Sequence, residues 1–98
     1  MSMTAVAPAG QKFNNIAGAA TTVVKTGPGV LHTITLNTKG TGSTATVYDN
    51  TAGSGTKIAT IDTTNVNTPD TLVFDVAFAT GLTVVTTGTL SDITVTYR

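Results

Sequence analysis

The sequence predicts an all-β protein: a β-sandwich of jelly-roll type, with about eight antiparallel strands and an extended N-terminal arm. Short runs of alternating apolar and hydroxyl side chains recur every 8 to 12 residues or so. Glycine or asparagine stands at most of the breaks between these runs, and no window has the apolar spacing of a helix. At 98 residues the chain has the length of one domain. We therefore expect an arm over residues 1–11 and a single β-sandwich domain over 12–98.

The first residues are small and unpatterned, which suits an extended arm better than a packed element. Residues 12–16 follow as a weak strand. Such arms often bind a neighbouring molecule, so we expect partner contacts from the arm and the start of this strand, at Thr4, Val6, Pro8, Lys12 and Phe13.

Two β-prone runs, 21–25 and 30–37, are joined by Gly27, Pro28 and Gly29. The first run is β-branched at four of five positions, as strands prefer. In the second, apolar and polar residues alternate, which is typical of a half-buried strand. This alternation predicts that His32 points to the apolar side, in phase with Ile34 and Leu36.

The next two strands are expected over 44–49 and 57–62, separated by the loop sequence DNTAGSG. The loop is too short to hold a helix, so the two strands are predicted to form a hairpin.

The most apolar face of the chain belongs to the run 71–78, in which Leu72, Phe74, Val76 and Phe78 lie opposite Thr71, Val73 and Asp75. This pattern predicts a central strand, with Asp75 on its outer face or paired with a lysine. Two further strands are expected over 82–86 and 93–97.

Composition indicates a surface suited to association. Only ten residues are charged, the five Asp balance four Lys and one Arg, and threonine fills 24 positions. A neutral, lightly charged surface favours association, while the scattered lysines argue against a nucleic-acid or membrane partner. The N-terminal sequence lacks the features of a secretory signal, no apolar run is long enough to span a membrane, and cysteine is absent.

Catalytic and metal-binding patterns find little support. His32 would need Ser43 or Ser54 and an Asp for a triad, but no GxSxG motif occurs and a structural histidine is favoured. One histidine without Cys or Glu cannot complete a zinc site.

The loop sequence DNTAGSGTK departs from both phosphate-binding and calcium-binding patterns, and a hairpin turn is favoured. Paired carboxylates for glycoside hydrolysis are weakly supported, since most aspartates stand at expected strand ends. Only Tyr48 and Tyr97 are candidates for sugar stacking. We expect no catalytic residue, no metal site and no cofactor.

Four segments, TGPGVLHTITLNT, ATVYDNTAGSGTKIATID, FDVAFATGLTVVTTGT and DITVTYR, resemble a recurrent small virion structural protein of tailed bacteriophages. The resemblance spans residues 21–98, and it is a pattern of glycines and strand residues without catalytic positions.

This resemblance implies a β-sandwich or jelly-roll protein displayed in many copies on the capsid surface, as a head decoration or cement protein made in the host cytoplasm. Its implied partners are the major capsid protein and copies of itself, for which we expect a homotrimer. A tail- or fibre-associated structural module is one alternative. A carbohydrate- or receptor-binding β-sandwich is another.

Overall fold

A computed structural model describes residues 11–98, which form eight antiparallel strands in two sheets and contain no helix. The prediction of an all-β chain with about eight strands is therefore confirmed. The strands are β1 (Lys12–Ala17), β2 (Ala20–Thr26), β3 (Gly29–Thr38), β4 (Thr44–Asp49), β5 (Thr56–Asp62), β6 (Asp70–Phe78), β7 (Gly81–Thr86) and β8 (Asp92–Tyr97).

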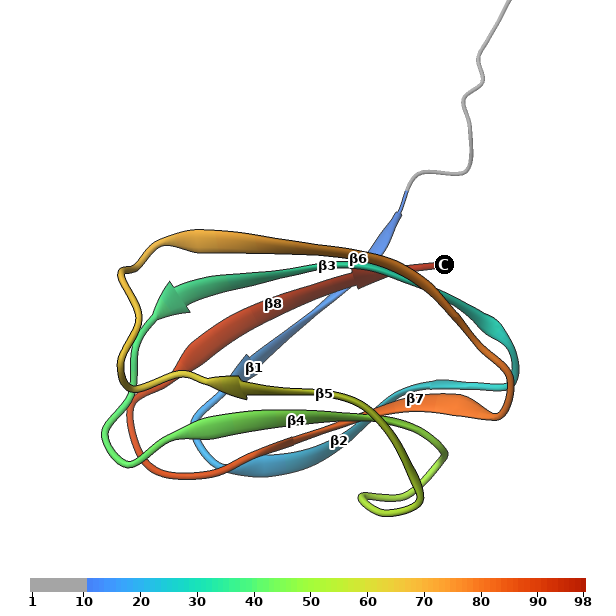
Figure 1. Cartoon of the computed structure of the whole chain (residues 1–98), viewed down its shortest axis with the longest axis horizontal. Coiled ribbons are helices and arrows are strands. Elements are labelled where there is room, and N and C mark those ends of the chain that lie inside the picture. Colours follow the sequence, from blue (N-terminus) through green and yellow to red (C-terminus); the bar gives the residue numbers. More distant parts are fainter. Residues whose placement is uncertain (1–10) are drawn as a thin grey trace, which may run out of the picture.

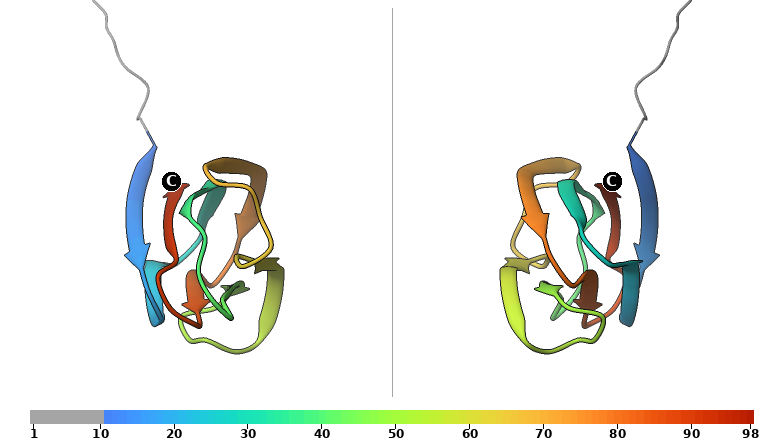
Figure 2. Two further views of the ribbon diagram at one scale, coloured as in Figure 1. Left: turned by 90° about the vertical axis from the view of Figure 1, so that its left-hand side faces the viewer. Right: turned by 90° about the vertical axis from the view of Figure 1, so that its right-hand side faces the viewer.

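Each sheet has four strands, and the two sheets lie face to face (Figures 1 and 2). Sheet A has the order β1-β8-β3-β6, and sheet B has the order β2-β7-β4-β5. The chain changes sheets at every connection except that between β4 and β5, which are paired as the predicted hairpin. The central strands therefore include β7 and β8, the last two along the sequence.

One apolar core lies between the two sheets. Sheet A and sheet B both contribute fully buried aliphatic side chains, among them Leu31, Ile34, Val95, Val47, Leu82 and Val84. Burial of each such side chain stabilises the fold by about 1.5–3 kcal/mol relative to exposure. The strand predicted over 93–97 is confirmed as β8, whose inward and outward residues alternate, with Ile93 and Val95 buried.

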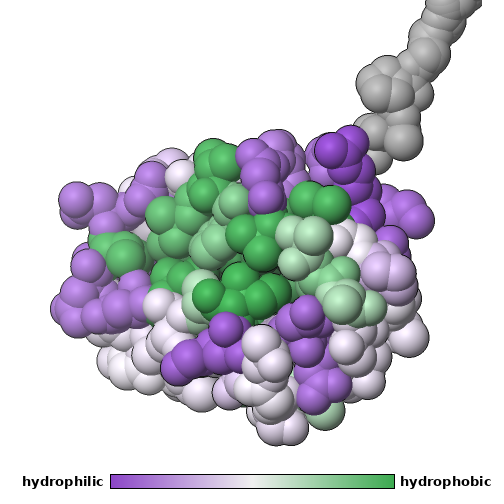
Figure 3. All heavy atoms as spheres, turned by 45° about the vertical axis from the view of Figure 1, so that its right-hand side comes forward, coloured by the Kyte–Doolittle hydropathy of each residue, from purple (hydrophilic) through white to green (hydrophobic). Residues whose placement is uncertain are grey.

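The prediction that residues 71–78 form a central strand is wrong. β6 pairs only with β3 and lies at the edge of sheet A. Its inward residues are less covered than those of β8, because no further strand shields them: Leu72 and Phe74 are half-buried and Val76 is exposed. Figure 3 shows an apolar area on the surface of the molecule. The apolar alternation correctly identified the inward face of β6 but not its position in the sheet.

The predicted arm falls mostly outside the described residues. Thr4, Val6 and Pro8 lie outside them, whereas Lys12 and Phe13 open β1 and are both exposed. Within residues 11–98 no helix is long and apolar enough to cross a membrane.

Candidate functional site

The outer surface of sheet A carries a patch of hydroxyl and amide side chains, which we term the hydroxyl face. It forms because β1, β3, β6 and β8 each turn apolar residues toward the core, so that alternate residues point outward. The register brings these outward residues together from strands far apart in sequence. The hydroxyl face comprises Asn15, Thr33, Thr35, Asn37, Thr71, Asp92, Thr94 and Thr96.

Side chains of the hydroxyl face bind one another across the strands. Thr35 Oγ1 and Thr71 Oγ1 are 3.1 Å apart, linking β3 to β6. At the other end, Asp92 Oδ1 accepts hydrogen bonds from Asn15 Nδ2 at 2.7 Å and Asn37 Nδ2 at 2.9 Å. These bonds hold the side chains in place, while each hydroxyl keeps acceptor capacity for a partner.

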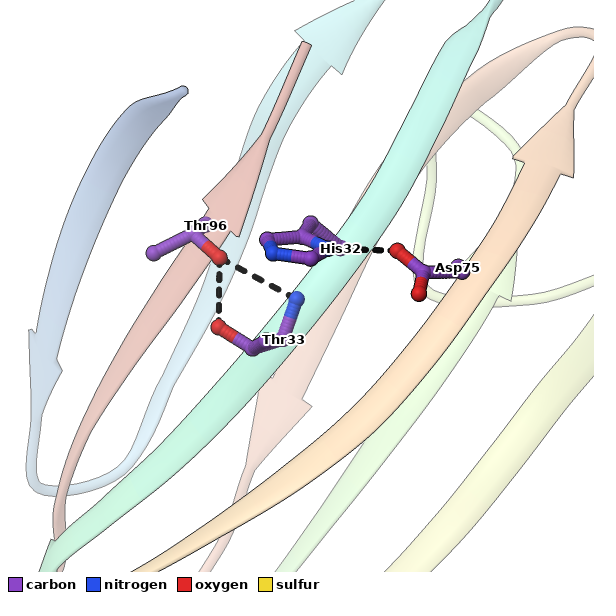
Figure 4. Close-up of polar contacts among 4 residues, drawn as sticks. All are labelled: His32, Thr33, Asp75 and Thr96. Carbon is purple, nitrogen blue, oxygen red and sulfur yellow. Dashed lines mark hydrogen bonds and ion pairs between the residues drawn. The ribbon is translucent and has the colours of Figure 1, made fainter. Parts of the chain in front are cut away.

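A β-bulge at His32 interrupts the regular pairing of β3. Leu31 is opposite Tyr97 and Thr33 is opposite Thr96, so His32 has no partner on β8. The Thr33 N–H donates instead to Thr96 Oγ1 at 3.1 Å, and the two hydroxyls are also in contact (Figure 4). The bulge moves Leu31 into the core and His32 out of it.

The prediction that His32 points to the apolar side is therefore wrong, because the bulge shifts the alternation. Its Nδ1 atom contacts Asp75 Oδ1 of β6 (Figure 4). Asp75 is exposed, as expected, but its side-chain partner is this histidine and not a lysine. The side chains are 39% and 60% exposed, which places the pair at the surface.

Two exposed apolar side chains flank one row of the hydroxyl face. Phe13 on β1 is opposite Thr96, Thr96 is opposite Thr33, and Thr33 is opposite Val73 on β6. Phe13 is 72% exposed and Val73 is 68% exposed. An uncharged row bounded by an aromatic and an aliphatic side chain is suited to contact with a broad, shallow protein surface.

The aspartates considered as catalytic candidates stabilise turns. Asp49 ends β4 and accepts N–H bonds from Ala79, Thr80 and Gly81 across the β6–β7 turn. These bonds, that from Ala79 most strongly, lower the pKa of Asp49. Asp62 ends β5 and likewise has a lowered pKa, chiefly through the side-chain bond from Asn65 at 2.9 Å.

The structure does not bring the candidate catalytic serines close to His32. Ser43 is buried, and its hydroxyl lies 2.6 Å from that of Thr63. Ser54 lies in the exposed β4–β5 loop, and its carbonyl accepts a hydrogen bond from Asn50. His32 contacts Asp75 instead, so the structure forms no Ser–His–Asp arrangement from the residues considered.

The two tyrosines do not form a common platform. Tyr48 belongs to β4 of sheet B, and Tyr97 belongs to β8 of sheet A, where it packs against the core. Among residues 11–98 there is no pocket and no group of three acidic, histidine or cysteine side chains placed to hold a metal ion.

Comparisons of the chain with protein-family models, with curated proteins and with solved structures found no match. The function of the hydroxyl face must therefore be inferred from its own residues. Sequence alternation indicated its threonines one strand at a time. The alternation did not indicate that these strands belong to one sheet. The face exists because β1, β8, β3 and β6 are neighbours in sheet A.

Proposed function

We propose that this protein is a non-enzymatic structural protein of a tailed-phage virion, a decoration or cement protein that binds and stabilises the capsid surface in many copies. The resemblance noted for residues 21–98 suggests this role, and the strand order supports it most strongly. The site residues proposed to contact a partner are those of the hydroxyl face, together with Phe13 and Val73.

The strand order supports a jelly roll as the finer description of the sandwich. β1 pairs with β8, β2 with β7, β3 with β6 and β4 with β5, all antiparallel. This is the set of pairs made when a long hairpin, with β4 and β5 at its tip, is rolled into two sheets. Jelly rolls recur as both capsid and lectin domains, so this order fits a virion role, and the position of Tyr48 and Tyr97 in different sheets weighs against a sugar platform made by both tyrosines.

The hydroxyl face supports contact with a protein shell. Asp92 is the one charged residue among these eight and is bonded to two asparagines, and the neighbouring Asp75 contacts His32, so little unpaired charge must lose its water when a partner covers the face. Threonine hydroxyls exchange bonds with water for bonds with a partner at a modest net gain of about 1 kcal/mol each. Phe13 adds an aromatic anchor of the kind that dominates many interfaces.

Many weak contacts become strong when repeated on a lattice, because each bound site raises the effective concentration of the next. We propose that Thr4, Val6, Pro8 and Lys12 add to this attachment and that the functional unit is a self-associated oligomer, with a trimer predicted from the resemblance. Deleting residues 1–10 is then expected to weaken particle binding while leaving the fold intact. Unchanged binding would count against the arm.

The decisive experiment is binding of purified variants to phage heads stripped of this protein, followed by sedimentation. Val73→Lys places a charge on the hydroxyl-face side of sheet A and should weaken binding at least tenfold. Val23→Lys is the matched control, because Val23 is an exposed valine on β2 of sheet B. Equal binding by the wild type, Val73→Lys and Val23→Lys would exclude this face as the contact with the shell.

Gold-labelled antibody on intact particles separates the related alternatives. Label over the head supports decoration, and label confined to the tail indicates a tail- or fibre-associated module. Saturable binding to a glycan, lost on substitution of Tyr48 or Tyr97, would instead indicate a receptor-binding module.

A further inference from the structure

The four edge strands of the two sheets differ in regularity. β2, β5 and β6 are each irregular in their pairing: the register shifts near Val23–Lys25, at Tyr48 opposite Lys57, and where β6 passes His32. β1 pairs with β8 without a shift, from Lys12 opposite Tyr97 to Ala17 opposite Asp92. β1 is therefore the one regular edge among the described strands.

Regular edges are unusual because their free N–H and C=O groups can pair with another strand. Proteins commonly block them with bulges, prolines or charges along the edge. β1 has six residues, no proline and one charged side chain, Lys12 at its first position. In Figure 2 it is the outermost strand of its sheet in both views, with no described strand beyond it.

We propose that β1 is a self-association edge, which pairs antiparallel with β1 of a second copy and joins two A sheets into one eight-stranded sheet. We choose a second copy as the partner because two antiparallel β1 strands have equal length, carry one charge each, and can place outward residues opposite outward residues. This inference uses only the geometry of β1 and does not depend on a virion role.

The pleat restricts the register of this pairing. Residues opposite each other must point to the same face, so outward Phe13 must face an outward residue of the second copy. The pairings centred on Asn14 and on Asn15 both meet this condition, and each pairs five of the six residues of β1. We choose the one centred on Asn14, because of these two only it brings the two Phe13 side chains within reach of each other. It sets Phe13 opposite the partner's Asn15, and Asn14 opposite the partner's Asn14.

Burial of Phe13 would favour pairing at this edge. Phe13 is the most exposed large apolar side chain within the described strands, at 72%. In the proposed register the two phenylalanines are diagonal neighbours on the outer face, about 7–8 Å apart, within reach of aromatic side chains. The pairing would cover surface that is otherwise left in water.

The charges are compatible with the pairing. Each Lys12 faces the partner's Ile16, and the two lysines lie about 14 Å apart at opposite ends of the paired strands. This separation exceeds the screening length of about 10 Å at 0.1 M salt, so their repulsion is small. The pairing has two-fold symmetry and yields a dimer, in contrast to the trimer predicted from the resemblance.

Light scattering and sedimentation velocity over a range of concentrations test the proposal, with the full chain and two charge variants. We expect a dimer whose dissociation constant rises at least tenfold in Phe13→Lys. Leu90→Lys is the matched control, because Leu90 is 76% exposed in the β7–β8 connection and is not part of β1. A monomer at all concentrations, a trimer, or equal weakening by both variants overturns the proposal.

Cross-linking tests the register independently, since the chain contains no cysteine. Asn14→Cys should form a disulfide-linked dimer on mild oxidation, because opposed residues have Cα atoms about 4.5–5.5 Å apart. Asn15→Cys should not, because its Cα atoms would lie about 8 Å apart in this register. A cross-link through Asn15→Cys, or through neither, overturns the pairing centred on Asn14.

One rival occupant is the chain's own N-terminal segment. If residues 1–10 cover β1 of the same molecule, the full chain will be monomeric and deletion of these residues will produce a dimer. That result would overturn self-association of the intact protein. A dimer that persists after the deletion supports direct pairing of β1.

Discussion

His32 and Asp75 meet where β3 and β6 lose their regular register. One residue of β3 lies between Leu31 and Thr33, whereas two residues of β6 lie between their partners Val76 and Val73. Asp75 has φ = 50°, in the left-handed region. Because both side chains are substantially exposed, their contact contributes little to stability, about 0–1 kcal/mol. The backbone conformation at Asp75 is therefore the more important feature.

Substitutions at Asp75 should rank by their tolerance of positive φ. Asp75→Gly and Asp75→Asn should change the free energy of unfolding by less than about 1 kcal/mol, because glycine and asparagine accept this conformation. Asp75→Val should destabilise by about 1–3 kcal/mol, since a β-branched residue is strained there. Urea denaturation measures the three values. Equal losses in all three variants would assign the effect to the His32 contact instead.

Acid should weaken the fold through Asp49 and Asp62. The pKa of each is lower in the folded protein, for Asp49 because the Ala79 N–H donates to its carboxylate. The ionised form therefore stabilises the fold above the unfolded pKa of about 4, and this contribution is lost as pH falls through the folded pKa.

Urea denaturation between pH 2.5 and 7 should show this loss in the wild-type protein and a shallower loss in Asp49→Asn. Asp62→Asn should flatten the profile separately, because its partners are different. Parallel profiles for the wild type and both variants would contradict the assignment.

Two buried serines should respond oppositely to removal of their hydroxyls. Ser91 Oγ is buried without a hydrogen-bond partner among the described residues, so Ser91→Ala should be neutral or stabilise by up to about 1 kcal/mol. Ser43 Oγ is bonded to Thr63, and Ser43→Ala should cost about 1–3 kcal/mol. Thermal and urea unfolding of the two variants and the wild type measure these changes in the free energy of unfolding. A loss in Ser91→Ala equal to that in Ser43→Ala would reveal a partner for Ser91.

Gly29 should tolerate no side chain. A Cβ at this position would collide with the Arg98 carbonyl oxygen and lie 2.7 Å from Phe78 Cζ. Gly29→Ala should therefore destabilise by about 1–3 kcal/mol or more. Gly18→Ala serves as a comparison, because Gly18 has φ = 72° but open space around it, and should cost about 1 kcal/mol. A smaller loss at Gly29 than at Gly18 would contradict this explanation.

Strand positions were largely predictable from sequence because alternation reports directly which residues face the core. The runs 44–49 and 93–97 and the β4–β5 hairpin illustrate this success. Which strands lie in the middle of a sheet was not predictable, because this depends on which strands become neighbours. β6 is the most apolar strand and lies at an edge, whereas central β7 buries Thr83 and Thr86. Their hydroxyls donate to the carbonyls of Asn50 and Gly18, which makes their burial acceptable.

The outward position of His32 was missed for a related reason. A bulge shifts the alternation by one residue, and the residues from Val30 to Leu36 carry no glycine or proline to announce it. The hydroxyl face also depends on pairing of β1 with β8, whose paired residues are 75 to 85 positions apart in the sequence. Such relationships belong to the folded chain and leave no local pattern in the sequence.

The position of β8 between β1 and β3 has a consequence for the order of folding during synthesis. β1 has no sheet partner until residues 92–97 have been made, and β2 has none until residues 81–86 have been made. Only β4–β5 and then β3–β6 can pair earlier along the emerging chain. Folding therefore waits until nearly all of these strands have left the ribosome, and pairing across such separations is slow, on the millisecond-to-second scale.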